Sequence, residues 1–282
     1  MVNGEGDRTG VLDVRPEAAF VALHRRGAVN IPLETLVGRI HELPPRDRSL
    51  LVYDAHPTRA RWAVSRLRAR GRWRIDVASG ADWLEEGPVE SGPSRDRLWK
   101  PHDLLVEGLE WCRREWGSLE GRTALDIACG SGRDAVFMGR AGLAVEAWDV
   151  LPDAVRLCEA LAGRNGVSIR AGCRDVERDV AIEPLRYDLI TCFNFLHRPL
   201  MPMIASAVRQ GGIVIYETFV EPQRKLFGKP RRDAHLLRTG ELPEYFDGWR
   251  VLVSREVLAG PRRFVASLIA MKGEGLRIAN GE

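Results

Sequence analysis

The sequence is poor in the features that mark secreted, metal-binding and nucleic-acid-binding proteins. Its five cysteines are odd in number and scattered, and no C-x-x-C pair occurs among them. Neither a disulfide framework nor a cysteine-ligated zinc site is therefore expected. The formal net charge is only +3, and no dense block of basic residues suggests a nucleic-acid partner.

Long apolar runs are also missing, since no stretch approaches the roughly 18 residues of a membrane span. The six histidines show no metal-ligand spacing, so no metal is expected. The hydrophobic content of 45% and the charged content of 29% fit an ordinary globular protein. We expect a cytoplasmic protein, monomer or homodimer, that acts on a small molecule without a nucleic-acid or membrane partner.

One segment combines a buried strand, a glycine-rich turn and the start of a helix. It reads Ala124-Leu-Asp-Ile-Ala-Cys-Gly-Ser-Gly-Arg-Asp134. Gly130 and Gly132 let the backbone turn sharply and approach a ligand, because glycine has no Cβ. The helix behind them offers unpaired N–H groups to that ligand. Asp149 ends the next hydrophobic run, where a doubly wound fold binds a ribose.

This pattern lacks the third glycine of the dinucleotide fingerprint and resembles the first motif of class I S-adenosylmethionine (SAM) dependent methyltransferases. The resemblance covers about residues 97–272 and is greatest to the small-molecule branch related to tellurite-resistance methyltransferases. It implies SAM as cofactor and S-adenosylhomocysteine as product. Asp149 would accept from the ribose, Leu151 would cover the adenine, and Asp175 would accept from the adenine amino group unless it only caps a turn. The full set implied for the cofactor is Asp126, Gly130, Gly132, Asp149, Leu151, Asp175, Val176 and Phe193.

Polar side chains follow the fourth and fifth expected strands of this part of the chain. Ligands bind at the carboxyl edge of such sheets. We expect His197 and Glu217 to be the groups that take a proton from the methyl acceptor, and Tyr216 to position it; these three are the catalytic candidates. The expected substrate-binding residues are Trp99, Asn194, Arg198, Arg231, Arg232 and His235.

Several of these residues could instead have a purely structural role. Asn194 could simply close a turn, and Trp99 could anchor a linker. The basic loop from Gln223 to Glu241 could grip a carboxylate through its arginines or could be a solvated loop.

Strand and helix patterns alternate in two separate sets, which predicts an α/β protein with mostly parallel sheets. The first set has strands near 11–14, 28–31, 50–53 and 75–77 and helices near 16–23, 33–42 and 58–70. The second has a helix around 101–116 and strands near 123–127, 144–149, 167–171, 187–192, 211–217, 249–255 and 263–271. Between them, residues 85–94 are rich in Gly, Pro, Ser and Glu, typical of a linker. We expect domains at 1–90 and 101–282, joined by a linker at 91–100.

The first domain resembles a rhodanese domain over nearly its whole length. The matching sequence segments are V-L-D-V-R-P-E-A-A-F at 11–20, H-R-R-G-A-V-N-I-P at 24–32, the loop at 53–59, and Gly80 with Trp83. In active members that loop begins with a cysteine that carries a persulfide, but here Asp54 holds the position. Aspartate cannot take up sulfur, and its charge would occupy the anion-binding cup. An inactive structural or dimerising module, or a wall of the active site, is expected rather than a retained anion- or chalcogen-binding role.

The fusion of the two domains resembles bacterial methyltransferases of sulfur and selenium metabolite pathways. These include enzymes that N-methylate the imidazole of thio- or selenohistidines on the way to ovothiol-type compounds. The resemblance implies methyl transfer to such a metabolite, at its imidazole nitrogen. The alternatives are S- or Se-methylation for chalcogen detoxification and a non-catalytic sensor that binds SAM and an anion.

Overall fold

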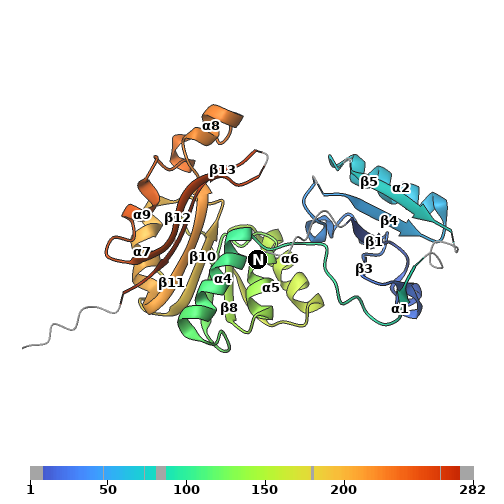
Figure 1. Cartoon of the computed structure of the whole chain (residues 1–282), viewed down its shortest axis with the longest axis horizontal. Coiled ribbons are helices and arrows are strands. Elements are labelled where there is room, and N and C mark those ends of the chain that lie inside the picture. Colours follow the sequence, from blue (N-terminus) through green and yellow to red (C-terminus); the bar gives the residue numbers. More distant parts are fainter. Residues whose placement is uncertain are drawn as a thin grey trace, which may run out of the picture. The chain divides into compact units, whose positions relative to one another are not determined.

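Two α/β units make up the structure, a computed structural model that describes residues 9–46, 48–72, 74–80, 87–178, 181–260 and 262–273. The chain divides into Met1–Lys100 and Pro101–Glu282. Each unit holds its own sheet and helices (Figure 1). The predicted fold class is confirmed.

The N-terminal domain is built on a parallel sheet with the strand order β3-β1-β4-β5. Its apolar core includes Leu12, Ile31, Leu50, Val52, Val64 and Leu67. The strands are β1 Gly10–Asp13, β3 Ala28–Asn30, β4 Leu50–Asp54 and β5 Ile75–Ser79, and the helices are α1 Glu17–Ala22 and α2 Pro57–Arg68. Each matches a predicted element to within a few residues.

The helix predicted at 33–42 is wrong. The chain there forms successive turns and ends in the 3-10 helix η1 Ile40–Glu42. The amide of Gly38 donates to the carbonyl of Thr35, and that of Arg39 is shared between Leu36 and Thr35, so bonds that span three residues predominate over α-helical ones. Gly38 in the middle of the segment weakens a longer α-helix.

Part of the segment predicted as a linker is hydrogen-bonded into the N-terminal domain. Strand β6 Val89–Glu90 pairs antiparallel with β2 His24–Arg25, and the Ser94 hydroxyl donates to the carbonyl of Ala28 at 3.1 Å. Residues 85 and 86 of that segment lie outside the described residues, as does Trp83, one of the residues that resemble a rhodanese domain. The predicted ends of the linker stay predictions. Residues 89, 90 and 94 are hydrogen-bonded to the N-terminal domain.

The C-terminal domain has a seven-stranded sheet with the order β12-β13-β11-β10-β7-β8-β9. Strand β13 is antiparallel to β11 and β12, and the pairs among the other neighbours are parallel. The predicted strands are all present, at β7 Thr123–Ile127, β8 Ala144–Asp149, β9 Ile169–Cys173, β10 Tyr187–Phe193, β11 Val208–Phe219, β12 Arg250–Leu258 and β13 Phe264–Met271.

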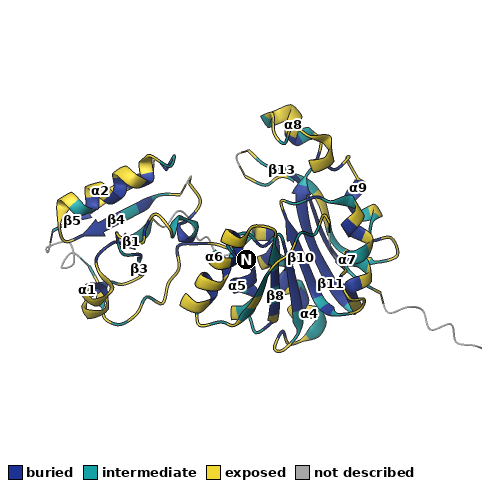
Figure 2. Ribbon diagram, turned by 180° about the vertical axis from the view of Figure 1, so that it is seen from behind, coloured by how far each residue is buried: buried dark blue, intermediate teal, exposed yellow. Residues whose placement is uncertain are grey.

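Helices cover both faces of this sheet, and the strands between them are buried (Figure 2). Side chains of β11 alternate between the faces. Ile213 and Ile215 join the core with α4, α5 and α6, whereas Val214 and Tyr216 join the core with α7 and α9. The helices are α4 Asp103–Trp116, α5 Arg133–Arg140, α6 Pro152–Arg164, α7 Met201–Ala207, α8 Pro222–Phe227 and α9 Glu241–Glu244, with the 3-10 helices η2 Arg198–Leu200 and η3 Asp233–His235.

In the described part of the chain, no helix combines the length and the apolar composition that crossing a membrane would require.

Helix α4 lies so close to β11 that a side chain at Gly108 would collide with it. A Cβ there would come within 2.9 Å of Ile215 Cγ1. We predict that Gly108→Ala lowers the free energy of unfolding by about 1–2 kcal/mol, because overpacking outweighs the gain in helix propensity. Thermal unfolding measures the effect. Gly163→Ala in α6 is the matched control, since a Cβ there meets nothing within 4 Å. Equal stability of both variants would contradict the close packing.

Candidate active site

The loop between β7 and α5 has the shape that the glycine motif predicts. Ala128, Gly130 and Gly132 have positive φ angles of 57°, 54° and 80°. A Cβ at Gly132 would lie 2.7 Å from Cys158 Cβ, so only glycine fits there. A Cβ at Gly130 would meet nothing within 4 Å, so the backbone is open on that side. A ligand can therefore come close to the loop's backbone.

Asp149, at the end of β8, is fixed against this loop. Its Oδ2 accepts the Gly130 N–H and its Oδ1 accepts the Leu151 N–H, each at 2.9 Å. Lone pairs remain on both oxygens for two hydroxyl donors. Beside it the side chains of Val150 and Leu151 are 53% and 60% exposed. The carboxylate could accept hydrogen bonds from the hydroxyls of a ribose, and the exposed aliphatic groups could contact the base that the ribose carries.

Asp126 is buried beneath the loop. Its Oδ1 accepts the Thr191 hydroxyl at 2.9 Å, while its Oδ2 has no hydrogen-bond partner among the described residues. Burial, with the nearby charge of Asp134, raises the pKa of Asp126 well above its usual range. A buried acceptor without a partner is rare and asks for a donor. An ammonium group of a ligand would supply one.

Asp175 serves a local purpose in this structure. Its Oδ1 accepts the Glu177 N–H at 3.0 Å, and its Oδ2 lies 3.7 Å from Arg178 Nε. This is the capping role that the sequence left open. The predicted contacts of Asp175 and Val176 with adenine stay predictions.

A polar cluster lies at the carboxyl ends of β10 and β11, centred on Glu217. That carboxylate is 3% exposed. Its Oε2 accepts the Ser267 hydroxyl at 2.6 Å and its Oε1 accepts from Arg263 Nη2 at 3.1 Å. Arg263 Nη2 also donates to Asn194 Oδ1 at 2.7 Å, and His102 Nε2 lies 3.2 Å from Glu217 Oε1. We call these five residues the Glu217 cluster.

The Glu217 carboxylate is held in its charged form. Burial alone would raise its pKa, but the hydrogen bonds from His102 and Ser267 and the charge of Arg263 bring the pKa below its usual range. The cluster therefore offers a fixed negative charge at the edge where ligands of such sheets bind.

His102 and Arg263 are members of the cluster that sequence reasoning missed. His102 precedes α4, its backbone N–H donates to Asp134 Oδ1 at 2.6 Å, and its ring stacks on Phe193 at 4.2 Å between centroids. Both residues lie far along the chain from Glu217. The packing of α4 on β11 and the antiparallel pairing of β13 with β11 bring them together. A histidine just before the first helix of the domain was the one available signal.

Tyr216 and His197, predicted beside Glu217, lie differently. Tyr216 is fully buried on the opposite face of the sheet, and its hydroxyl donates to the Phe195 carbonyl at 2.8 Å. It thereby fixes the turn after β10, where Asn194 has a φ of 59°. His197 is half-buried at the start of η2. The catalytic roles expected of both stay predictions.

Arg198 holds the segment above this edge rather than standing free. Its Nε and Nη2 donate to the two oxygens of Glu241 at 2.6 and 2.9 Å, and Nη2 also donates to the Leu236 carbonyl. Burial would raise the pKa of Glu241, but the bonds from Arg198, Tyr245 and the Arg238 backbone lower it to about 2. This ion pair fastens the chain around 236–241 to η2. A direct contact of Arg198 with substrate stays a prediction.

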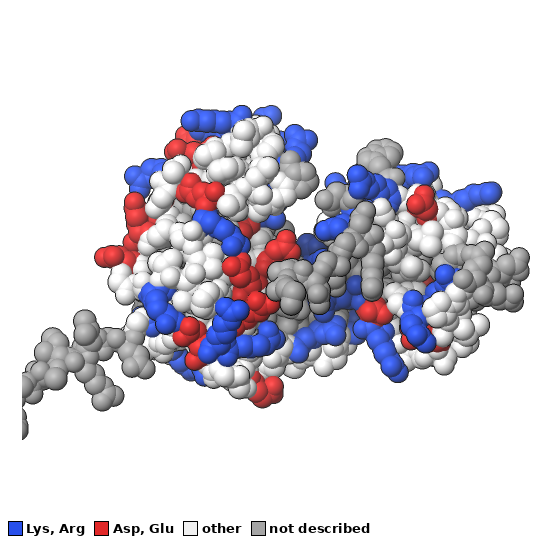
Figure 3. Space-filling model, in the orientation of Figure 1, with Lys and Arg blue, Asp and Glu red and all other residues white. Residues whose placement is uncertain are grey.

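The basic segment after α8 is exposed. Arg231, Arg232 and His235 all lie on the surface, and neither arginine forms an ion pair with another described residue. Figure 3 shows lysine and arginine side chains gathered at the end of the domain that carries α8. The segment thus presents unneutralised positive charge, as the sequence predicts for a loop that either grips an anion or is solvated.

Trp99 belongs to the N-terminal unit, Met1–Lys100. Its side chain is buried, and the guanidinium of Arg97 lies 5.0 Å from the ring centroid. Its predicted contact with substrate stays a prediction.

In the N-terminal domain, Asp54 ends β4 at the head of the rhodanese-like loop. Its Oδ1 accepts the His56 N–H at 2.9 Å and its Oδ2 accepts from Arg59 Nε at 3.0 Å. The carboxylate thus takes up a loop amide that would otherwise be available to an anion. A charge fixed by two donors leaves the loop without a nucleophile at this position.

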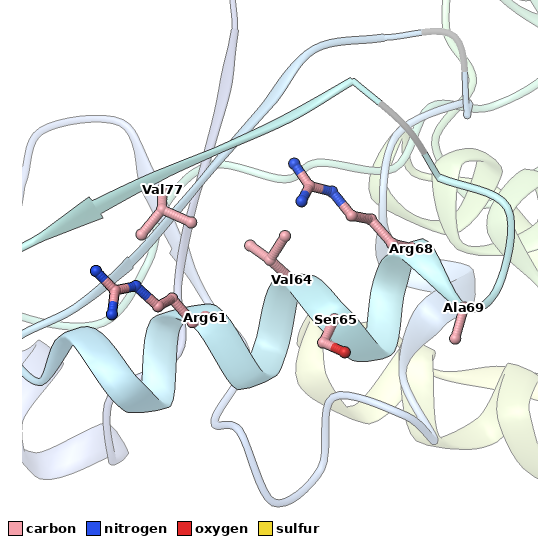
Figure 4. A pocket seen from close by; sticks show the side chains of 6 residues that line it. All are labelled: Arg61, Val64, Ser65, Arg68, Ala69 and Val77. Atoms are coloured by element: carbon pink, nitrogen blue, oxygen red, sulfur yellow. The ribbon is translucent and has the colours of Figure 1, made fainter.

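Two other hollows carry no comparable chemistry. One, of about 440 Å³, lies between α2 and β5, with Arg61, Val64 and Arg68 extending toward the side where Val77 lies (Figure 4). The other, of about 580 Å³, lies at the amino ends of the strands of the larger sheet. Arg186 and Arg209 at this place are already paired with Glu146 and Asp188. Among the described residues, no group of three or more His, Cys, Asp or Glu side chains could hold a metal.

Comparison with known proteins identifies both domains. Residues 124–212 match the family model described as "Methyltransferase domain", and residues 2–81 match "Rhodanese-like domain". An uncharacterized protein of Schizosaccharomyces pombe is 26% identical over 82% of this chain and 82% of its own length. The ubiquinone biosynthesis O-methyltransferases of Bordetella avium and Klebsiella pneumoniae (strain 342) are 30% and 28% identical over 43% and 51% of this chain. The chain spans 56% and 64% of those two enzymes.

Solved structures of similar fold include TehB from Haemophilus influenzae, with a TM-score of 0.49, 20% identity, and coverage of 61% of this chain and 62% of that one. Magnesium protoporphyrin IX methyltransferase from Synechocystis with bound SAM has a TM-score of 0.46 and 16% identity, covering 60% of this chain and 78% of that one.

The chain therefore contains a SAM-dependent methyltransferase domain, preceded in sequence by a rhodanese-like domain. The residues present fit the cofactor, because the glycine loop is open at Gly130 and Asp126 has an unused buried oxygen. Asp149 would hold the ribose, and the glycine loop with Asp126 would hold the methionine part.

We predict that Asp149→Asn weakens SAM binding by about 1–3 kcal/mol, the cost of losing hydrogen bonds to a charged group. The amide would also turn a donor toward the N–H of Gly130 or Leu151. Isothermal titration measures the affinity. Asp153→Asn is the matched control, because Asp153 is exposed at the start of α6 and its ion-pair partner among the described residues is the exposed Arg156. Unchanged affinity in Asp149→Asn would remove Asp149 from the site.

We also predict that the protein forms no thiocyanate from thiosulfate and cyanide, because Asp54 replaces the sulfur-carrying nucleophile. A colorimetric thiocyanate assay on the full chain tests this, with Asp54→Cys as the informative variant. Activity of the wild type would refute the prediction. Activity of the variant alone would show that the rest of the loop has kept its anion-binding form.

Proposed function

We propose that this enzyme methylates an imidazole nitrogen of a small, amino-acid-like metabolite that contains sulfur or selenium. The acceptor binds over the carboxyl ends of β10 and β11, against the Glu217 cluster. The observation that carries the proposal is the ionised, buried carboxylate of Glu217 at this edge, on the sheet face that also bears Phe193 and α4.

SAM, when bound, supplies a methyl group on a sulfonium and with it the driving force. The chain's own residues have to hold the acceptor in line. Glu217 and Asn194 offer oxygen acceptors for the N–H groups of an imidazole or an ammonium. Alignment of this kind can contribute about 7–11 kcal/mol to the rate.

The charges above this edge suit an acidic group on the acceptor. Arg231 and Arg232 are exposed and carry no ion pair with another described residue, and Lys225 and Lys229 are on the same segment. The carboxylate of an amino acid is the simplest partner for such groups. The similarity to ubiquinone biosynthesis O-methyltransferases supports a small-molecule acceptor, although those enzymes are named for oxygen rather than nitrogen.

A nitrogen acceptor also fits the charge of Glu217 better than a thiolate or selenolate does. A fixed anion repels an anionic nucleophile across a short distance, whereas it stabilises the positive charge that develops on a methylated imidazole. S- or Se-methylation is therefore the weaker reading of this site.

We predict that Glu217→Gln lowers methyl transfer to imidazole amino acids by about 10²–10⁴-fold, the usual range when proton transfer from the acceptor is impaired. Methyl-labelled SAM and a panel of histidine, thiohistidine, thiol and selenol compounds measure it. SAM affinity should stay close to that of the wild type. Glu159→Gln, an exposed position on α6, is the control.

Two outcomes would contradict the proposal in different ways. Transfer only to thiols or selenols, undiminished in Glu217→Gln, would favour the detoxification reading. SAM binding without transfer to any compound of the panel would favour a sensor.

A further inference from the structure

The two ring nitrogens of His102 have different surroundings. Nε2 lies 3.2 Å from Glu217 Oε1 and 3.2 Å from Arg263 Nη2. Nδ1 is buried and has no hydrogen-bond partner among the described residues. The ring is held in place by its stacking on Phe193 and by the bond from its own backbone N–H to Asp134.

The contacts of Arg263 and Glu217 favour one tautomer of this ring. Arg263 Nη2 has two hydrogens for three neighbours, because the oxygens of Asn194 and Glu217 lie at 2.7 and 3.1 Å and His102 Nε2 lies at 3.2 Å. The ionised Glu217 carboxylate can only accept. A hydrogen on Nε2, donated to Glu217 Oε1, leaves both hydrogens of Nη2 to the two oxygens, and this is the tautomer on which our inference rests.

Three charged groups face the ring from three different elements. Arg263 stands 3.2 Å from Nε2 and opposes a second positive charge. Glu217 on β11 and Asp134 on α5 face the ring from two other elements and favour such a charge. With Nε2 protonated and the ring neutral, Nδ1 carries a free lone pair.

A buried lone pair without a partner costs about 1–3 kcal/mol, so it calls for a ligand or a chemical role. His102 sits between the helix of the glycine loop, to which Asp134 belongs, and the ends of β10 and β11. These are the two sides of the proposed site.

We infer that His102 is the general base of the methyl transfer, through Nδ1, and that Glu217 is the positioning residue that holds its tautomer. This rests on the proposed function. As the acceptor's lone pair forms the bond to the methyl carbon and the carbon–sulfur bond breaks, the acceptor's proton passes to Nδ1. S-adenosylhomocysteine leaves, and the imidazolium returns the proton to water. The substrate class is thereby restricted to nucleophiles that keep a proton at neutral pH, such as N–H or O–H groups.

The tautomer can be tested without any substrate. In the full chain labelled with ¹⁵N-histidine, proton–nitrogen correlation spectra at neutral pH should show His102 protonated at Nε2 and bare at Nδ1. Comparison with His102→Gln assigns its signals. Glu217→Gln should shift the ring toward a mixture of tautomers, and Glu217→Asp should restore part of the preference. A ring protonated at Nδ1, or doubly protonated, would overturn the inference.

Kinetics test the role. His102→Gln keeps an N–H for Glu217 but has no base, so transfer to the imidazole acceptor should fall by about 10²–10⁴-fold. SAM affinity should hold, so that the loss falls on the rate of transfer alone. Glu217→Gln should also lower that rate, and Glu217→Asp should partly restore it. His56→Gln, exposed in the N-terminal domain, is the control.

The results separate the two claims. If the wild type methylates an imidazole acceptor and His102→Gln does so equally fast, the inference fails and the proposed function stands. If the wild type binds SAM but methylates nothing in the panel, the proposed function fails, and the tautomer spectra still decide whether Glu217 orients the ring.

Discussion

The buried charge of Glu217 is the constraint on which the candidate active site at the carboxyl ends of β10 and β11 depends. A carboxylate almost out of reach of water must be paired, since an unpaired buried charge is far costlier than any single contact can offset. Its partners come from three places. Arg263 directly precedes β13, Ser267 lies in the middle of β13, and His102 directly precedes α4. Pairing one charge therefore fixes the first helix, the central strands and the last strand of the domain against each other.

The glycine loop is organised in the same way, around the carboxylate of Asp149. Asp149 accepts the amides of Gly130 and Leu151, so the glycine loop is already in shape before a ligand arrives. The tight packing of Gly132 on Cys158 fixes the loop from beneath. A preformed loop spends less binding free energy on ordering the chain, which leaves more for alignment of the acceptor. Asp54 in the rhodanese-like domain shows the reverse case, because there an aspartate takes up the amide that a ligand would need.

Much of this could be predicted from local signals. Strands occur where hydrophobic runs predict them, and the glycine turn, Asp149 and Glu217 lie at the carboxyl ends of strands that meet at one edge of the sheet. The helix predicted at 33–42 failed because its apolar spacing is also satisfied by a series of turns that pack Leu33 and Leu36 into the core. Residues 89 and 90, whose polar, glycine-rich surroundings are typical of a linker, pair as the short strand β6 with β2, and composition does not reveal such a pairing.

The sequence by itself determined the two α/β domains, the cofactor loop and the polar residues at one edge of the larger sheet. Each of these depends on neighbours along the chain. Only the tertiary structure decided which polar residues meet. Tyr216 and Glu217 are adjacent in sequence, yet strand alternation sends them to opposite faces, and Arg198 is taken up by Glu241. His102 lies 115 positions before Glu217, and only the packing of α4 on the sheet brings its ring to that carboxylate. Contacts between distant segments are set by which faces pack together, and local patterns do not encode that.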